Sequence, residues 1–228
     1  MMKKILSICG MGLLVISILG ACSLFGGNKE PLNGLMLLGE EQALKKIETE
    51  HKKEIKSATF YKVKQEENNG KKMFIMNEKT AEEIVKRGIL REKDDDEWMR
   101  NSTPLSSLPK IKEKEVLVFA DPKHKDIKNV EVNGMKIQAK YESNSGFRFP
   151  RGDQQKEELL LVVDNATFQK IPSPEIDMSI VELNKTYGEN KTITDDDIEA
   201  VQAQNEWEKL TKSIQDDVKS VIDISIMK

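Results

Sequence analysis

Apolar residues recur at helix and strand spacings along the chain, and turn residues separate these segments. Over 40–56 the spacing is weakly helical, with Lys and Glu in between, which predicts a solvated helix with one buried edge. Alternation over 58–64 and an apolar segment over 72–76 flank Asn69-Gly70, which is a strong turn signal. The pattern therefore predicts a β-hairpin directly after the first helix.

A capped helix is predicted after this hairpin. Asn77 is a favourable N-cap, the apolar positions of 78–87 fall on one face, and Gly88 is typical of a helix C-terminus. Three consecutive aspartates follow at 94–96, and the polar stretch after them contains two prolines. We interpret the segment from Glu92 through these prolines as an irregular loop.

The middle of the chain has the spacing of a sheet. An apolar run at 115–120 is typical of a buried strand, and 130–141 contains two strands joined by Asn133-Gly134, the clearest hairpin signal in the chain. Residues 142–156 are loop by composition. Five consecutive apolar residues at 159–163 then predict a central strand.

The last part of the chain predicts a short helix over 165–171, a strand over 176–183 and a long closing helix. Thr194 and the acidic residues 195–197 resemble a capping box, and the helix is expected to run to about Ser220 or beyond. Its apolar stripe consists of Ile198, Val201, Leu210, Ile214, Val218 and Val221, with Trp207 at the margin. The stripe predicts that this helix packs on the sheet.

The order of these elements predicts a single α+β domain with a mixed or mainly antiparallel sheet, peripheral helices and a long C-terminal helix. The chain has 228 residues, of which 38% are apolar, and this is enough for one ordinary core.

The first 21 residues have the organisation of a signal peptide. Lys3 and Lys4 precede an apolar stretch that ends in small residues and is shorter than the roughly 20 residues of a membrane-spanning helix. Leu19-Gly20-Ala21-Cys22 resembles the lipobox of bacterial lipoproteins. The resemblance implies cleavage between Ala21 and Cys22, and a diacylglyceryl group on the sulfur of Cys22, which becomes the mature N-terminus.

Residues 22–34 are rich in Gly and Asn and contain Pro31, so we interpret them as a lipidated flexible tether. At about 3.3 Å per residue, this segment reaches roughly 40 Å from the bilayer. The remaining residues, 35–228, form the predicted domain. We expect it on the extracytoplasmic side of the cell membrane, held there by its N-terminal lipid.

Composition excludes several classes of function. The chain contains two His and two Cys, too few for almost every His/Cys metal site, thiol catalyst or disulfide framework. Removal of 1–21 leaves 34 basic and 39 acidic side chains, a formal net charge of −5. This balance argues against nucleic acid as a partner and against a basic patch on anionic lipid.

No catalytic motif is evident. His51 lies in a Lys/Glu-rich helix and His124 in a Lys-rich loop, and neither has a second His at helical spacing. The sequence has no nucleophile elbow, Walker A loop or dinucleotide fingerprint. The acidic runs 94–96 and 195–197 lack EF-hand spacing, and we interpret them as a solvated loop and a helix cap. We therefore expect no enzyme activity, no cofactor and no metal.

One loop has the composition of an interaction site. Phe147, Arg148, Phe149 and Arg151 combine aromatic and Arg side chains, which are enriched at binding hot spots. The alternative is that one of the two Phe residues is simply buried in the core.

The segments 130–137, 160–171 and 176–183 form a further pattern: an Asn-Gly hairpin, a strand ending in an acid that caps a helix, and another strand. This pattern resembles the extracytoplasmic domains of FtsX-type ABC permeases. With the lipobox, the whole chain also resembles the uncharacterised lipoproteins of Bacillus-type bacteria.

Three functions fit these observations. The permease resemblance implies an accessory or sensor lipoprotein that works beside an FtsX-type permease. A stand-alone binder of a small ligand or peptide and a structural protein of the envelope are the alternatives.

Overall fold

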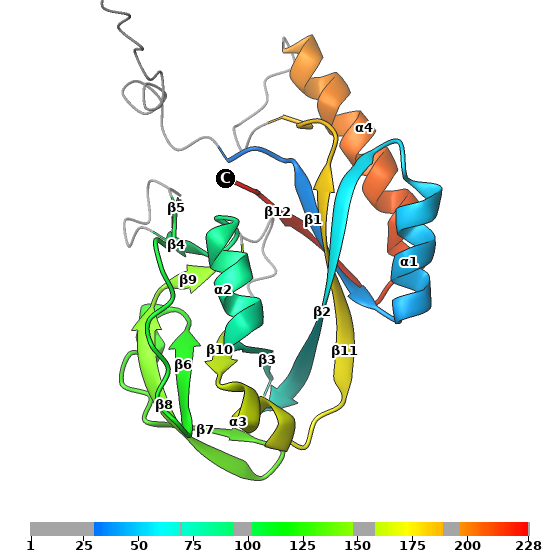
Figure 1. The fold of residues 1–228 in the computed structure, drawn as a ribbon. Coiled ribbons are helices and arrows are strands. Elements are labelled where there is room, and N and C mark those ends of the chain that lie inside the picture. The colour runs from blue at the N-terminus through cyan, green and yellow to red at the C-terminus, as the bar shows by residue number, and fades with distance from the viewer. Residues whose placement is uncertain (1–29, 69, 94–101, 148–157, 189–196, 228) are drawn as a thin grey trace, which may run out of the picture.

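The computed structural model describes residues 30–68, 70–93, 102–147, 158–188 and 197–227, and Figure 1 shows their arrangement. The elements are β1 (Gly34–Gly39), α1 (Glu41–Glu50), β2 (Ile55–Asn68), β3 (Lys71–Asn77), α2 (Glu78–Lys86), β4 (Arg91–Lys93), β5 (Ser102–Pro104), β6 (Glu115–Phe119), the 3-10 turn η1 (Pro122–His124), β7 (Asn129–Val132), β8 (Met135–Ser143), β9 (Ser145–Gly146), β10 (Glu158–Val163), α3 (Asn165–Lys170), β11 (Glu175–Leu183), α4 (Ile198–Gln215) and β12 (Ser220–Ile224).

Nine of these strands form one sheet in the order β12-β1-β11-β2-β3-β10-β6-β8-β7. The pairs β3–β10 and β6–β8 are parallel, and the other neighbours are antiparallel. A small second sheet has the order β5-β4-β9. The predicted α+β domain with a mixed sheet is therefore confirmed.

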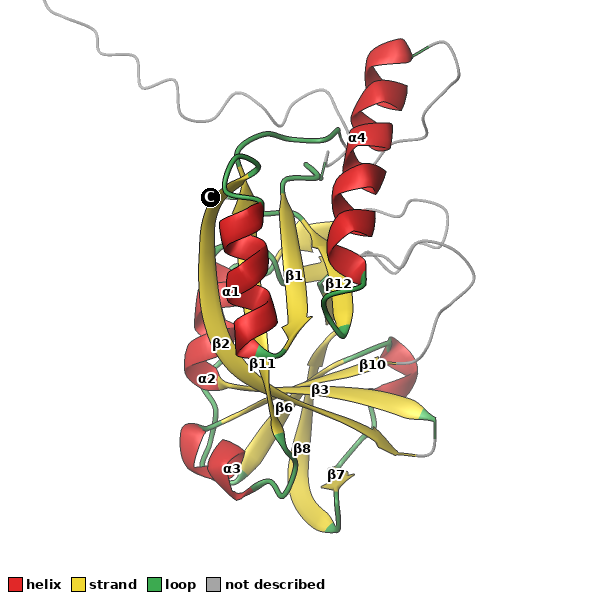
Figure 2. Ribbon diagram, turned by 90° about the vertical axis from the view of Figure 1, so that its right-hand side faces the viewer, coloured by secondary structure: helices red, strands yellow, loops and turns green. Residues whose placement is uncertain are grey.

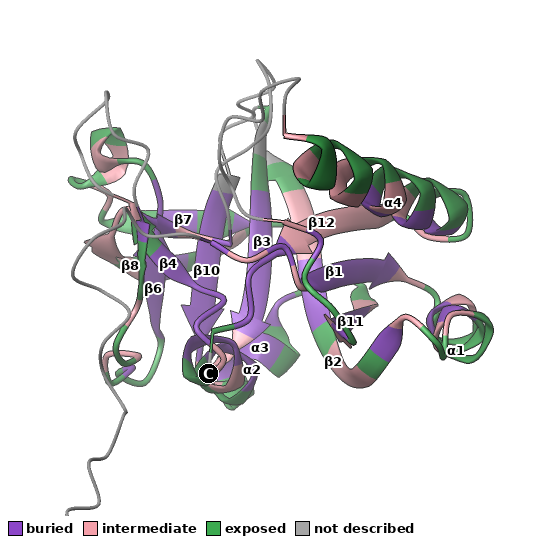
Figure 3. Cartoon of the chain, turned by 90° about the horizontal axis from the view of Figure 1, so that it is seen from above, coloured by how far each residue is buried: buried purple, intermediate pink, exposed green. Residues whose placement is uncertain are grey.

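Helices α1 and α4 cover the same face of the sheet, over β1 and β11 (Figure 2). Helix α1 buries Leu44 and Ile47, and α4 buries Trp207, Leu210 and Ile214. Figure 3 shows that the outer faces of both helices are exposed, while the strands beneath them are largely buried. Both helices are thus amphipathic, and their stability comes mainly from packing.

Helices α2 and α3 pack on opposite faces of the paired strands β3 and β10. Ile84 of α2 belongs to the cluster that contains Met76, whereas Phe168 of α3 belongs to the cluster that contains Ile75. Consecutive residues of a strand point to opposite faces, so the two clusters lie on the two sides of the sheet.

Several local predictions are confirmed. Asn133 (φ 46°) and Gly134 (φ 80°) form the β7–β8 turn, where both central residues need positive φ. Strands β2 and β3 form the predicted hairpin. The Asn77 side chain accepts a hydrogen bond from the Thr80 N–H (2.9 Å) and caps α2, which is followed by Gly88 at φ 66°.

The predicted helix over 40–56 is too long. Helix α1 ends at Glu50, and Ile55 begins β2, where it pairs with Leu183 of β11. Strand β1, a short apolar strand that begins and ends with glycine, is not predicted from the sequence and lies between β11 and β12.

The C-terminal boundary of the predicted tether is also wrong. Leu32 is 4% exposed and exchanges backbone hydrogen bonds with Tyr187 and Gly188 (2.9 and 3.0 Å), and Gly34 already belongs to β1. Residues 30–34 are therefore part of the packed domain, because backbone pairing and side-chain burial hold them there.

The last helix ends earlier than predicted. Helix α4 stops at Gln215, and the chain turns back into β12, whose Val221 pairs with Leu37 of β1. Without β12 the β1 backbone would have an open edge, and pairing it outweighs continuation of the helix. The expected cap Thr194 lies outside the described residues, and Asp197 caps α4 instead, accepting from the Ala200 N–H at 3.0 Å.

Two predicted loops contribute to the small sheet. Strand β5 and the last two residues of β4 lie in the segment from Glu92 onward that the sequence predicts to be irregular, and β9 lies in 142–156. The aspartates at 94–96 lie outside the described residues. Cross-strand pairing of short segments far apart in sequence leaves no periodic signal to detect.

Candidate functional site

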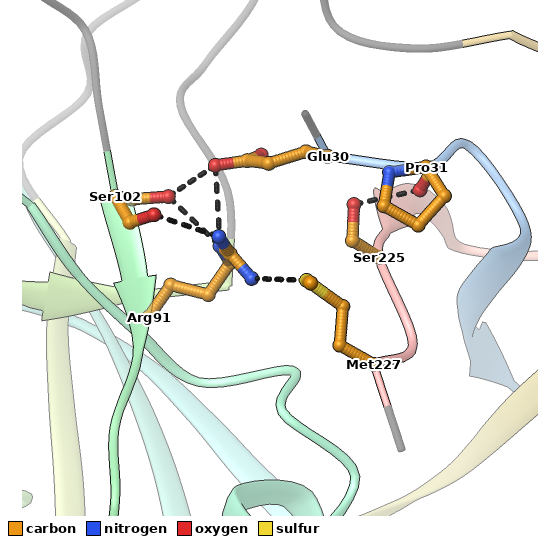
Figure 4. A network of polar contacts seen from close by, with 6 residues as sticks. All are labelled: Glu30, Pro31, Arg91, Ser102, Ser225 and Met227. Atoms are coloured by element: carbon orange, nitrogen blue, oxygen red, sulfur yellow. Dashed lines mark hydrogen bonds and ion pairs between the residues drawn. The ribbon is translucent and has the colours of Figure 1, made fainter. Parts of the chain in front are cut away.

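The most distinctive polar site lies at the start of the described domain, at Glu30 and Pro31 (Figure 4). The Ser225 hydroxyl donates to the Pro31 carbonyl at 2.7 Å. The Asn33 amide donates to the Ile226 carbonyl (2.9 Å) and accepts from the Ile226 N–H (2.8 Å). The segment that leads into β1 is thus bonded to the segment that follows β12.

A buried ion pair lies at the centre of this site. The Nε of Arg91, on β4, is 3.1 Å from Oε1 of Glu30, and each side chain is 2% exposed. Arg91 also donates to the Ser102 hydroxyl (2.8 Å) and carbonyl (2.7 Å) on β5, and the Ser102 hydroxyl donates to Glu30. Its third nitrogen, Nη1, lies 3.0 Å from the sulfur of Met227. We call Glu30, Arg91, Ser102 and Met227 the junction cluster.

The junction cluster joins three separate parts of the chain: the start of the domain, the small sheet and the C-terminus (Figure 4). Glu30 and Arg91 are both buried, and an unpaired buried charge is strongly destabilising. Each of the two charges is therefore tolerated only because the other neutralises it. Among the described residues, Glu30 Oε2 has no hydrogen-bond partner. The arrangement is suited to holding the N-terminal segment in place.

A second polar feature, the distal groove, lies at the opposite end of β1. It has a volume of about 500 Å³ and is open to solvent, and it is lined by Gly39, Glu40, Ala43, Glu175, Ile176, Asp177, Asp217 and Lys219. These residues come from the ends of β1 and α4 and the starts of α1, β11 and β12.

Lysines at the margin neutralise part of this acidic groove. Lys62 pairs with Asp177 at 2.5 Å, and Lys46 pairs with Asp217 at 3.0 Å. The hydrogen bond to the Asp177 carboxylate raises the pKa of Lys62, and the one to Asp217 raises the pKa of Lys46. No cluster of three His, Cys, Asp or Glu with metal-binding geometry occurs among the described residues.

The structure divides the predicted interaction loop. Phe147 is 9% exposed and packs edge-on against Phe74, with ring centroids 5.2 Å apart. It is therefore a core residue, as the alternative interpretation held, and not part of an exposed site. Arg148, Phe149 and Arg151 lie outside the described residues, as do Ala21 and Cys22.

The two histidines lie on separate elements: His51 follows α1, and His124 ends the η1 turn. A buried cation that sequence reasoning missed is Lys64, which is 3% exposed. Its ammonium donates to the carbonyls of Phe168 (2.9 Å) and Ile171 (2.7 Å) and lies 4.9 Å from the Phe168 ring centroid. It thus satisfies carbonyls at the end of α3.

Sequence reasoning also missed Glu30 and Arg91. The two residues are 61 positions apart, and Glu30 stands in a stretch whose composition is that of a linker. Pro31, next to it, was the one signal of restricted backbone in that stretch.

Within the described part of the chain, no helix is both long and apolar enough to cross a bilayer. Fold and junction together define a domain of mixed α+β architecture whose N-terminal segment is fixed to its C-terminal end. The chain belongs to a family described as an uncharacterised lipoprotein family, whose profile matches residues 32–218.

One solved structure has a similar fold. It is the 1.5 Å crystal structure of a protein from Bacillus anthracis that is provisionally described as a lipoprotein. The TM-score is 0.63 at 22% sequence identity, and the match covers 86% of this chain and 99% of the other. No curated protein matches the sequence.

Proposed function

We propose that this chain is a lipoprotein anchored through a lipid on Cys22, with its domain on the extracytoplasmic side of the cell membrane. The lipobox at Leu19–Cys22 supports the anchor, and family membership supports the class. The observation that carries the proposal is the lipobox, which matches at all four positions. Glu30 follows Cys22 by eight residues, which span at most about 27 Å, so the domain is held near the bilayer.

The anchor is tested by replacing Cys22. In cells fed labelled palmitate, Cys22→Ala is expected to abolish labelling and to leave the precursor uncut. The variant also loses the acyl chains that would hold the protein in the membrane. The matched control is Cys9→Ala, because Cys9 is the other cysteine of the chain and lies within the signal peptide. Normal processing and membrane retention of Cys22→Ala would overturn the proposal.

We further propose that the domain works by binding and not by catalysis. The two histidines lie on separate elements, and the sequence contains no nucleophile or phosphate-binding motif. The partner that we propose is an FtsX-type ABC permease, for which this chain is an accessory or sensor protein. The support is the resemblance of 130–183 to the extracytoplasmic domains of those permeases.

Crosslinking in cells, followed by mass spectrometry of the membrane complex, tests the partner. Phe149→Ala with Arg151→Ala is the appropriate variant, because Phe147 is needed for the core. Recovery of the permease with the parent chain and its loss with the variant are expected. Recovery of the lipoprotein alone from the parent cells contradicts an accessory role and favours a structural role in the envelope.

A stand-alone ligand binder is the second candidate, and the distal groove is the observation that favours it. The acidic side chains of the groove suit a cationic ligand or a basic peptide. Spermine and a polylysine peptide are practical probes, and binding at this groove raises the melting temperature of the parent chain. If the double variant Glu175→Gln with Asp177→Asn shows the same increase in melting temperature as the parent chain, the probe binds elsewhere.

A further inference from the structure

The exposed large apolar side chains among the described residues are Ile198, Val201 and Met227, with exposed fractions of 77%, 37% and 38%. Ile198 and Val201 are three residues apart on α4 and therefore share one face of the helix. Buried residues of α4 begin only at Trp207. The first turns of this helix therefore present an apolar face that the sheet does not cover.

Contacts with β1 show at which end of the sheet this face lies. Strand β1 runs from Gly34 to Gly39, and Val218, after the end of α4, lies beside Gly39. At the other end of β1, Leu32 pairs with Tyr187, whose ring lies 5.4 Å from that of Trp207. The N-terminus of α4 is therefore at the Gly34 end of β1.

Helix α4 continues past this end of the sheet. Ile198 precedes Trp207 by nine residues, or about 13 Å of helix. Figures 1 and 2 both show α4 extending beyond β1 at the end of the molecule where the C-terminus also lies. Met227 belongs to the junction cluster beside Glu30, so all three exposed apolar side chains lie at the end where the chain joins its anchor.

The length of the anchor segment determines what this end faces. If Cys22 carries the lipid, at most about 27 Å of chain separates the bilayer from Glu30. A tether this short keeps the junction end beside the membrane at a high effective concentration, so that even a weak apolar contact is populated.

We propose that the first turns of α4, with Ile198 and Val201, dock on the lipid bilayer at the boundary between headgroups and acyl chains. This inference rests on the proposed anchoring through Cys22. Apolar side chains at the end of an exposed helix partition into this layer. The contact would fix the orientation of the domain, with the distal groove facing away from the membrane.

Charge specifies the kind of lipid. Asp197 and Glu199 flank Ile198, and no basic residue occurs from 197 to 208. Farther along the helix, Glu206 pairs with Lys185. The contact therefore depends on apolar burial and changes little with salt on phosphatidylcholine. It is weaker on phosphatidylglycerol, whose charge repels the acidic residues.

Hydrogen exchange of the chain from Cys22 to Lys228 tests the proposal. Cys22, the one cysteine in that chain, is coupled to a maleimide lipid in phosphatidylcholine vesicles or to soluble maleimide polyethylene glycol. The first N–H groups of a helix lack intrahelical partners and exchange readily. We expect exchange over 198–204 to be at least about threefold slower on vesicles than on the soluble polymer.

Paired substitutions identify the cause. Ile198→Ser with Val201→Ser is expected to abolish the vesicle-dependent protection. Lys209→Ser with Lys212→Ser has the same spacing on the exposed surface of the packed half of α4 and is expected to retain it. Circular dichroism checks that both pairs remain folded.

Three outcomes overturn the inference: equal exchange on vesicles and polymer, protection that survives in the Ser pair, or protection of the polymer-coupled chain that grows with protein concentration. The last outcome would assign the face to a second copy of the chain. Because the coupling is chemical, these results do not depend on whether cells lipidate Cys22, which the Cys22→Ala experiment measures separately.

Discussion

At the residue scale, the Glu30–Arg91 pair makes a strong prediction because both side chains are almost fully buried. Glu30→Ala leaves the Arg91 guanidinium without its carboxylate in a site that water does not reach. We expect the free energy of unfolding to fall by about 3–5 kcal/mol. Urea denaturation of the chain from Cys22 onward measures this loss.

The matched control for this pair is Glu41→Ala. Glu41 and Lys45 form an ion pair of 2.6 Å on the exposed side of α1, and solvent screens it. A far smaller loss of stability than for Glu30→Ala is expected, because both partners are exposed. Equal effects of the two substitutions would show that the junction cluster does not stabilise the domain.

Two lysines on β2 give a second comparison. Lys64→Met removes an ammonium that satisfies two carbonyls at the end of α3, and we expect a loss of about 3 kcal/mol. Lys62→Met, two residues earlier, removes a side chain that is 49% exposed and paired with Asp177, so the loss should stay below about 1 kcal/mol. Thermal unfolding of both variants compares them, and a larger loss for Lys62→Met contradicts the prediction.

Residues that act locally could be predicted from the sequence, and residues that act across the fold could not. Asn77 caps α2 as expected, because cap and helix are adjacent in the chain. Glu30 and Arg91 are 61 positions apart, and Lys64 is 104 and 107 positions from the two carbonyls that it satisfies. Phe147 shows the same limit, since an aromatic residue in a polar stretch gives no sign of whether it packs on Phe74.

At the scale of elements, the cap of α3 depends on pH. Burial raises the pKa of the Asp164 carboxyl, but hydrogen bonds from the Thr167 hydroxyl (2.6 Å) and from backbone N–H groups outweigh it and lower the pKa overall. A lowered pKa in the folded state stabilises the protein above the unfolded value of 3.8, and this contribution disappears as the pH falls through the folded value.

Asp164→Asn tests this dependence. The variant keeps an oxygen that can cap the helix but has no charge to titrate. We expect the parent to be more stable than the variant at about pH 6, and the difference to narrow toward about pH 3. Urea midpoints at both pH values measure it, and a constant difference would contradict the argument.

Two turn glycines at positive φ are expected to differ in tolerance. At Gly134 (φ 80°) a Cβ would meet nothing within 4 Å, whereas at Gly88 (φ 66°) it would lie 2.7 Å from the Met227 carbonyl oxygen. Gly134→Ala should therefore cost about 1–2 kcal/mol from backbone strain alone, and Gly88→Ala at least about 1 kcal/mol more. Chemical denaturation of both variants ranks them, and a reversed order excludes the steric explanation.

Element types were predicted well where the apolar period was clear, and element ends were not. The stripe of the last helix continues at helical spacing through Val218 and Val221, so its sequence gives no reason to stop at Gln215. The structure ends the helix there because β12 pairs with β1. Whether these residues continue the helix or form a strand is decided by β1, near the start of the described domain. A local sequence pattern contains no information about so distant a strand.

At the scale of the whole molecule, the true start of the domain can be measured. A chain that begins at Leu35 lacks Leu32, which is buried, and leaves Arg91 without Glu30. We expect it to be less stable than a chain that begins at Cys22 by at least about 3 kcal/mol. Equal denaturation curves would restore the boundary at 35.

The fold class could be predicted from the sequence, because it depends on the order of helices and strands along the chain. The order of the strands within the sheet could not be predicted. Neighbours such as β12 and β1, or β1 and β11, come from opposite ends of the chain. The junction cluster exists only because this order brings the start of the described domain beside the segment that follows β12.

The pairing of β1 on both sides has a mechanical consequence. If the proposed anchor is pulled, the force enters the described domain at Glu30 and passes to β1, whose hydrogen bonds to β11 and β12 run across the strand axis. Such a load strains the bonds of both ladders in shear, all together, and does not peel them apart one by one. A protein held by one end at a membrane and by a partner at the other would bear tension through a strand that is paired on both sides.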